Sequence, residues 1–292
     1  MNRILILPTY LKKLNCWPYL CLFHEIRDKL GFKLQFSDRI DVSSDIDELF
    51  LFGMPYHNRP ELIPGFLDLN KNVKLILHTG DINCHNNKVC LSNKLKVFKR
   101  CDVILSPSYE YFLSNYPQFA DKYVYLPASF DTHTQYTQLP FNNTPIMKCL
   151  LTGTISWAYP IRSFISENKI KNIKRIEKLD GYVGYKYAKL LNSYFCCVTS
   201  SGVSRVALSK FFEIPATGSL LLTDTIDDMD RLGFIPDQHY VSITKKNVFS
   251  KIQHCLSHPD QYEYIRREGM KFIIKNHSVI NRIEQLKEVL GK

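Results

Sequence analysis

The first 126 residues alternate between two patterns of apolar and polar positions. Short apolar runs that end at Pro, Gly or polar residues predict buried strands, and longer stretches with apolar positions three and four apart predict helices. The clearest helical pattern covers Trp17–Leu30, where Gly31 ends it. The other predicted elements are strands at Arg3–Pro8, Lys33–Phe36, Leu49–Phe52, Val73–Leu77, Val103–Ser106 and Tyr123–Leu126, and helices at Asn93–Arg100 and Tyr109–Phe119. This alternation favours a parallel sheet with helices on both faces.

The segment Pro127–Pro145 interrupts the alternation. It is rich in Pro, Thr, Asn and Gln and has no sustained apolar period, which is typical of a linker. Beyond it we expect strands at Met147–Thr152, Phe195–Thr199, Leu220–Thr223 and near Tyr240–Ile243, a strand or turn near Ile176–Val183, and helices at Ile161–Glu167, Tyr185–Ser193, directly after Ser204, and at Val248–His258, Pro259–Ile274 and Val279–Leu290. The sequence therefore predicts α/β domains at residues 1–130 and 146–275, a linker at 131–145 and a C-terminal helix at 276–292.

The composition is that of a soluble globular protein. The chain of 292 residues is 45% hydrophobic and 23% charged, and no apolar run approaches the roughly 20 residues of a membrane span. The N-terminal MNRILILP lacks the pattern of a secretory signal, and the nine cysteines include no Cys-x-x-Cys spacing. We therefore expect reduced, buried thiols and a cytoplasmic protein.

The sequence contains one grouping of residues with metal-ligand chemistry: His78, Cys84, His85 and Cys90. Its spacing matches no familiar zinc pattern. We therefore expect neither a metal nor a prosthetic group.

The net charge of +10 is compatible with nucleic acid, an anionic membrane surface or phosphorylated substrates. The densest basic run, residues 169–178, mixes lysines with isoleucines, which favours a solvated face around a short buried element. The sheet-aromatic signature of RNA-binding domains does not accompany it. We expect no nucleic-acid partner, while a peripheral membrane contact stays open.

The loop after the predicted strand Phe195–Thr199 has the composition of an anion site. In open parallel sheets ligands bind beyond the carboxyl ends of the strands, and Ser200–Ser204 would connect such an end to a helix N-terminus. Ser204 would be the N-cap, and Gly202 would let a ligand approach the backbone. The P-loop and Gly-x-Gly-x-x-Gly patterns are absent, which counts against a P-loop NTPase and a dinucleotide dehydrogenase.

The helix expected after this loop would carry charges on one face. Arg205, Ser209 and Glu213 are spaced by four and would form a row, with Lys210 beside it. Such a cluster is either a surface ion-pair network or a site for a sugar nucleotide. In the second case the cations would neutralise a diphosphate, and the carboxylate would accept hydrogen bonds from ribose hydroxyls.

The stretch Arg205–Asp224 resembles the "R-x-F-E-x-x-A-x-G-x-L-L-L-T-D" signature of GT-B glycosyltransferases of the spore-maturation-protein-like branch. The likeness extends over residues 126–280 through four further segments, namely Leu126–Asp131, Gly153 with Tyr159–Arg162, Tyr187–Ser193, and His258–Gly269 with its "H-P-E-x-R-x-x-I-A-x-x-G" pattern. The first 125 residues match this family only in their α/β alternation and in Cys101–Ser106.

This resemblance implies two Rossmann-like doubly wound domains that face a cleft, with the C-terminal helix packing back on the N-terminal domain. It also implies a hexosyl- or pentosyltransferase of glycan biosynthesis, with a UDP- or GDP-linked sugar donor on the second domain and a glycan or small hydroxyl acceptor on the first, and without a metal. The donor-binding residues it implies are Glu213 for the ribose, Arg205, Lys210 and Arg162 for the phosphates, Ser201 and Gly202 through their backbone, and Gly153, Tyr182 and Val183, the last two beside the base.

One departure from the family concerns stereochemistry. Many retaining members have a second acid eight residues before the ribose glutamate, and here that position is Arg205. This mildly favours inversion, which requires a general base near the acceptor. His78 and Asp81, after the predicted strand Val73–Leu77, and His57 are the candidates. Two alternatives remain at this point: a non-catalytic module that binds glycans or nucleotides, and a basic nucleic-acid-binding protein.

Overall fold

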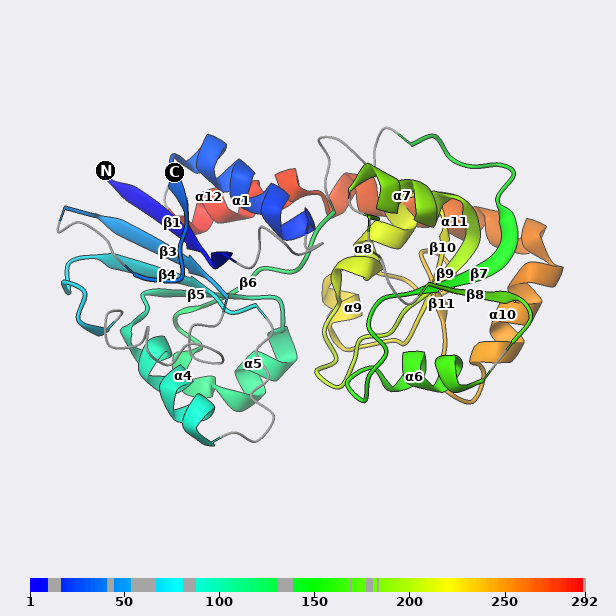
Figure 1. The fold of residues 1–292 in the computed structure, drawn as a ribbon, viewed down its shortest axis with the longest axis horizontal. Coiled ribbons are helices and arrows are strands. Elements are labelled where there is room, and N and C mark those ends of the chain that lie inside the picture. The colour runs from blue at the N-terminus through cyan, green and yellow to red at the C-terminus, as the bar shows by residue number, and fades with distance from the viewer. Residues whose placement is uncertain are drawn as a thin grey trace. The chain divides into compact units, whose positions relative to one another are not determined.

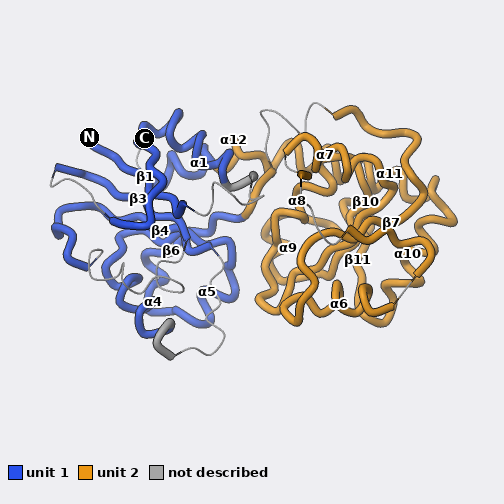
Figure 2. Tube along the Cα trace, in the orientation of Figure 1, with its two compact units in different colours: residues 1–127, 283–292 blue, residues 128–282 orange. Residues whose placement is uncertain are grey.

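The structure is a computed structural model that describes residues 1–9, 17–40, 45–53, 67–80, 88–130, 139–168, 170–176, 181–182 and 184–290, with the side chains of residues 17–19 and 88–90 outside the description (Figure 1). These residues form two compact units. Unit 1 contains residues 1–127 and 283–292, and unit 2 contains residues 128–282 (Figure 2).

Unit 1 is built on a six-stranded sheet of order β2-β1-β3-β4-β5-β6 in which every neighbouring pair is parallel. Its elements are β1 (Arg3–Leu7), α1 (Trp17–Leu30), β2 (Lys33–Phe36), β3 (Glu48–Phe52), β4 (Lys74–His78), α4 (Lys88–Arg100), β5 (Val103–Ser106), α5 (Tyr109–Asn115), the 3₁₀ helix η2 (Pro117–Phe119) and β6 (Tyr123–Tyr125). The end of α12 (Val279–Leu290) also belongs to this unit, where Gln285 donates a hydrogen bond of 2.5 Å to the Tyr125 carbonyl.

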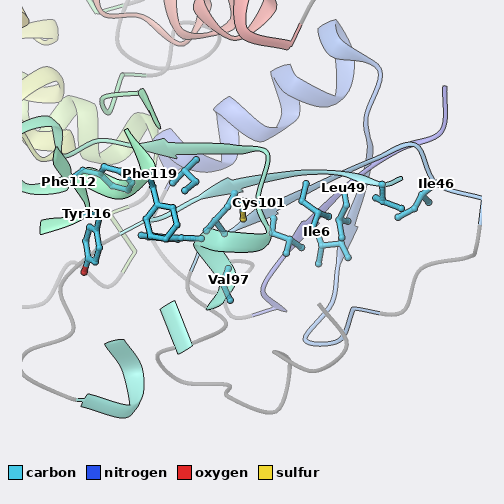
Figure 3. Close-up of a cluster of buried hydrophobic side chains, with 14 residues drawn as sticks. Ile6, Ile46, Leu49, Val97, Cys101, Phe112, Tyr116 and Phe119 are labelled. Carbon is cyan, nitrogen blue, oxygen red and sulfur yellow. The ribbon is translucent and has the colours of Figure 1, made fainter. Parts of the chain in front are cut away.

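One hydrophobic cluster joins the sheet of unit 1 to α4 and α5. Figure 3 shows Ile6 and Leu49 from the sheet, Val97 from α4 and Phe112 from α5 among its members. The central strands β3 and β4 are almost entirely apolar because helices cover both faces of a parallel sheet. This arrangement confirms the α/β class that the alternating pattern predicts.

A single helix over Tyr109–Phe119 is predicted, but α5 ends at Asn115. Tyr116 has a φ of −135°, because the residue before a proline is pushed out of the helical region, and Pro117 then starts η2.

Unit 2 is built on a five-stranded parallel sheet of order β11-β10-β9-β7-β8. Its elements are β7 (Ile146–Thr152), α6 (Pro160–Glu167), β8 (Ile173–Ile176), α7 (Tyr185–Asn192), β9 (Tyr194–Val198), α8 (Ser209–Ala216), β10 (Leu220–Thr223), α9 (Asp228–Arg231), β11 (Val241–Ser242), α10 (Val248–Ser257), α11 (Pro259–Asn276) and the start of α12. The order of the strands reverses between β7 and β9, which lie side by side although β8 follows β7 in the chain. This reversal is the point at which open α/β sheets bind ligands.

The strand or turn expected near Ile176–Val183 falls largely outside the described residues, which exclude residues 177–180 and Val183; strand β8 ends at Ile176. The four-residue helix α9 is absent from the prediction because it is shorter than the window over which a helical period can be recognised.

The cysteines that the structure describes are free and buried, as the sequence predicts: Cys21, Cys101, Cys149, Cys196, Cys197 and Cys255. Burial raises the pKa of the Cys255 thiol to about 12 and also raises the pKa values of the Cys101, Cys196 and Cys197 thiols. Within the described part of the chain, no helix combines the length and apolar character required to cross a bilayer.

Candidate functional site in unit 2

Several polar side chains gather where the strand order of unit 2 reverses. Thr152 ends β7 and is followed by Gly153, and the loop after β9 begins with Thr199 and Ser200. Because parallel strands end at the same edge of a sheet, these loops meet the start of α8 there. We refer to this region as the switch-point site.

Two cations lie beside Gly153. A Cβ atom on this glycine would come within 3.0 Å of Lys210 Cε and 3.2 Å of Arg162 Nη1. The backbone here has a φ of +95°, a conformation that glycine adopts readily and other residues adopt only with strain. The absence of a side chain at this position therefore leaves room for both cationic groups.

The ammonium group of Lys210 is held by Tyr187 on α7. Lys210 Nζ donates a hydrogen bond to the Tyr187 hydroxyl and lies 4.8 Å from the centre of its ring. The same hydroxyl lies 3.2 Å from Thr152 Oγ1. Burial raises the pKa of Tyr187, although the nearby Lys210 opposes this change, so the phenol stays protonated at neutral pH.

Glu213 lies one helical turn after Lys210 on α8. It is 5% exposed, and its immediate neighbours on α8, Phe212 and Ile214, are buried and apolar. Helix α8 packs against α11. Its negative charge contributes to the raised pKa of Tyr187, after burial, which is the main cause. A cation and a carboxylate therefore share the switch-point site.

Arg162, a predicted phosphate contact, is buried and bonded to backbone carbonyls in the structure. It is 2% exposed, its Nη2 donates to the Ser200 carbonyl at 3.1 Å, and its Nη1 donates to the Thr154 carbonyl at 3.3 Å. The guanidinium also stacks on Tyr159, 3.7 Å from the ring centre. Burial lowers its pKa, and the guanidinium crosslinks the loops after β7 and β9.

The expected anion loop is occupied by a side chain of the protein itself. Asp224, directly after β10, accepts hydrogen bonds from the Ser201 backbone N–H at 2.8 Å and from the Ser201 hydroxyl at 2.5 Å. Gly202 also departs from expectation, because a Cβ atom there would lie 2.8 Å from the Ala158 carbonyl and 3.1 Å from the Tyr159 ring. The small residue permits packing against the preceding loop rather than the approach of a ligand.

Helix α8 begins later than predicted, which moves Arg205 away from the row that its spacing suggests. The chain turns at residues 202–205, and the helix starts at Ser209 with Leu208 rather than Ser204 as its N-cap. Arg205 adopts a left-handed φ of 49° in this turn, which a helix cannot contain. Its side chain is half exposed and forms an ion pair of 3.3 Å with Asp227.

Three buried polar atoms near the end of β9 have no hydrogen-bond partner among the described residues: Arg162 Nε, Thr199 Oγ1 and Ser200 Oγ. Buried polar groups are rarely left unpaired in a folded protein. Their concentration at the switch point is consistent with a site that a ligand or water completes.

Tyr182 is 37% exposed and follows Gly181, whose φ is +79°. This residue presents an aromatic ring in the loop before α7. Its predicted neighbour in the site, Val183, lies outside the described residues.

The predicted general bases belong to unit 1. His78, the last residue of β4, is 1% exposed, lies 4.7 Å from the Phe52 ring and accepts a hydrogen bond at Nδ1 from the Gly80 N–H at 3.1 Å. Burial lowers its pKa to about 3. Because it is enclosed and weakly basic, His78 is poorly suited to accept a proton from an acceptor hydroxyl, while Asp81 and His57 lie outside the described residues.

No group of three or more His, Cys, Asp or Glu side chains within the described ranges could hold a metal ion. In the grouping noted in the sequence, Cys84 and His85 lie outside these ranges and the side chain of Cys90 is not described. That grouping is therefore untested.

Tyr187, Thr152 and Asp224 are part of the site but were not predicted as functional residues. Thr152 and Asp224 could have been found from their positions at and directly after the ends of parallel strands, where ligand sites occur. Tyr187 could not be found in this way, because it lies in the first turn of α7 and not at the end of a strand.

The family model described as "Glycosyl transferase-like" matches residues 140–288, which is more than half of the chain and includes the whole switch-point site. No curated protein matches the sequence.

Solved structures of glycosyltransferases share the fold. HepE from Anabaena, in complex with UDP, has a TM-score of 0.69 at 10% identity over 99% of each chain. Sucrose-phosphate synthase from Thermosynechococcus elongatus has a TM-score of 0.64 at 11% identity over 97% of this chain and 78% of its own. A glycosyltransferase from Rickettsia africae has a TM-score of 0.58 at 11% identity over 99% of this chain and 98% of its own. Together with the two parallel sheets, these likenesses establish the GT-B fold.

Proposed function

Because this chain belongs to the glycosyl transferase-like family, we propose that it transfers a sugar from a nucleotide-sugar donor to a hydroxyl group of a glycan or small acceptor. The observation that carries the proposal is the presence of Lys210 and the buried Glu213, one helical turn apart on α8, at the switch point of unit 2. The ammonium group suits a diphosphate, and the carboxylate suits the vicinal hydroxyls of a ribose. Both requirements are those of a nucleoside diphosphate.

We assign the donor to unit 2 and the acceptor to unit 1. The UDP complex of HepE supports a uridine nucleotide as the first donor to try, with a guanosine nucleotide as the second. Tyr182 is the proposed contact for the base, since its exposed ring lies in the loop before α7.

In the proposed reaction the acceptor oxygen attacks the anomeric carbon of the donor sugar. The bond from this carbon to the diphosphate oxygen breaks, and the nucleoside diphosphate leaves with the bonding electron pair. A general base accepts the proton of the acceptor hydroxyl, and Asp81 and His57 are the candidates. Lys210 stabilises the charge that develops on the leaving diphosphate. We propose that the transfer occurs without a metal and with inversion at the anomeric carbon.

Thermal denaturation tests the donor site. UDP or GDP is expected to raise the melting temperature of the wild type, because a ligand that binds only the folded state stabilises it. The same nucleotide is expected to raise that of Glu213→Ala much less, since the ribose contacts are lost. Equal stabilisation of both proteins would contradict the role of Glu213.

Turnover separates an enzyme from a binding module. Purified protein is incubated with a panel of UDP- and GDP-linked sugars, with and without oligosaccharide acceptors, and release of the nucleoside diphosphate is measured. Release that Glu213→Ala abolishes supports the transferase. Nucleotide binding without release from any donor in the panel would favour the non-catalytic module.

A further inference from the structure

We propose that Tyr187 is a positioning residue that holds the Lys210 ammonium group in place for the donor diphosphate. This inference rests on the proposed function, and it concerns a residue that would touch no part of the donor. Tyr187 acts through Lys210 alone.

The direction of the hydrogen bonds follows from the chemistry of the groups. A lysine ammonium has three donors and no acceptor, so the Tyr187 oxygen accepts the bond from Lys210. The phenolic proton is then free to bond Thr152 Oγ1, 3.2 Å away. Thr152 is the last residue of β7, so this chain of contacts ties the ammonium group to the end of that strand.

The burial of the pair keeps the tyrosine neutral. Tyr187 is 7% exposed and Thr152 is 4% exposed, and burial raises the pKa of the phenol. An ionised phenolate would form an ion pair with Lys210 and cancel its charge. A neutral hydroxyl orients the ammonium group and leaves its positive charge available to an anion.

Lysine needs such support more than arginine does. Its ammonium group is a compact charge on a flexible four-carbon stem, and fixing that stem costs side-chain entropy. The Tyr187 oxygen fixes one direction of the ammonium group, and the ring 4.8 Å away adds a cation–π contact. Folding therefore orders the lysine before the donor arrives.

The position of Lys210 beside Gly153 leaves its ammonium group accessible to a diphosphate. Lys210 Cε would lie only 3.0 Å from a Cβ atom on Gly153. The ammonium group thus sits against a backbone without a side chain at the end of β7, where a diphosphate can approach it closely.

Isothermal titration of UDP and of GDP tests this role in the wild type, Tyr187→Phe, Lys210→Met and the double variant. Phenylalanine keeps the ring and the volume but lacks the oxygen. Tyr187→Phe is expected to bind the nucleoside diphosphate about fivefold to tenfold more weakly, the fold-change that corresponds to the typical net contribution of one hydrogen bond. In the Lys210→Met background the same change is expected to have no further effect.

Uridine and guanosine lack phosphates, so their binding distinguishes support of Lys210 from a general structural role. If Tyr187 had a general structural role, its substitution would also weaken the binding of these nucleosides. Their affinities, measured by ligand-observed NMR, are expected to be the same in the wild type and Tyr187→Phe. The control is Tyr262→Phe on α11, which removes a hydroxyl bonded to His254 Nδ1 at 2.8 Å and is expected to leave all affinities unchanged.

The outcomes distinguish failure of the role proposed for Tyr187 from failure of the proposed function. Equal binding of the diphosphate by the wild type and Tyr187→Phe, equal losses for diphosphate and nucleoside, or a further loss in the Lys210→Met background would each overturn the inference alone. Failure of the wild type to bind either UDP or GDP would overturn the proposed function, and this inference with it.

Discussion

The carboxylate of Asp224 holds Ser201 at both its backbone and its side chain, with hydrogen bonds of 2.8 Å to the N–H and 2.5 Å to the hydroxyl. The two residues follow the neighbouring strands β10 and β9. The carboxylate thus takes the place that an external anion would have in the loop after β9. A bound diphosphate is therefore expected to rely on Lys210 rather than on this loop.

Asp224→Ala should destabilise the protein more than Ser201→Ala does. The first change removes both hydrogen bonds and leaves a buried N–H unpaired, at a cost of about 1–3 kcal/mol, whereas the second removes only the hydroxyl bond, worth about 1 kcal/mol. Urea denaturation measures both. Because the residues form one unit, the double variant should be no less stable than Asp224→Ala, and additive losses would contradict a direct interaction.

Gly153→Ala should lower nucleotide affinity as well as stability. Its Cβ atom would displace Lys210 and Arg162, in addition to the strain of a φ of +95°. The matched control is Gly233→Ala, which has a similar φ of +76° but only an ordinary contact of 3.4 Å with the Phe272 ring. Both variants should lose about 1–3 kcal/mol of stability. Only Gly153→Ala should bind UDP or GDP more weakly in a titration, and equal affinities for the two variants would exclude displacement of the cations.

The substitution Arg162→Lys distinguishes a phosphate contact from a crosslink between the loops after β7 and β9. If its charge contacts phosphate, Arg162→Lys should preserve most of the nucleotide affinity. If it crosslinks two loops, lysine cannot reach both the Ser200 and Thr154 carbonyls, and stability should fall by about 1–3 kcal/mol for each acceptor left unpaired. We expect the second result, together with faster hydrogen exchange in residues 153–158 and 199–204. Full stability of Arg162→Lys would restore the phosphate interpretation.

The sequence predicts elements well where local signals agree. Helix α12 spans Val279–Leu290 as predicted, and α1 spans Trp17–Leu30, because a sustained apolar period coincides with clear ends. Strands β2 and β5 also have their predicted bounds; β2 alternates polar and apolar residues, and β5 is a short apolar run. Such elements can be identified without knowledge of their tertiary partners.

The site was harder to predict because its contacts join distant parts of the chain. The spacing of Arg205, Ser209 and Glu213 predicts one helix that contains all three residues. Arg205 instead adopts a left-handed conformation in a turn, and α8 starts only at Ser209. The hydrogen bond from Ser201 to Asp224 joins residues that are 23 positions apart in the sequence, and no local pattern of residues predicts it. The family resemblance likewise suggested a phosphate for Arg162, whereas in the structure this buried side chain donates from Nη1 and Nη2 to backbone carbonyls.

His277 should make stability depend on pH below neutrality. Its Nε2–H donates to the Leu232 carbonyl at 2.9 Å, and its Nδ1 accepts from Arg282 at 2.8 Å, so the buried ring is neutral. Burial and then the adjacent guanidinium lower its pKa to about 3. The unfolded chain therefore takes up this proton first as the pH falls.

The stabilisation associated with His277 should be complete above about pH 6.5 and be lost as the pH falls toward 3, at up to about 1.4 kcal/mol per pH unit. His277→Gln keeps an amide donor and a carbonyl acceptor but cannot titrate. Urea denaturation between pH 4 and 7 should show a shallower dependence of the free energy of unfolding on pH for this variant than for the wild type. Part of the slope should remain, because His78 is buried with its pKa lowered to about 3 as well. NMR titration of the imidazole resonances provides an independent check, since protonation of His277 near pH 6.5 in the folded protein would contradict this account.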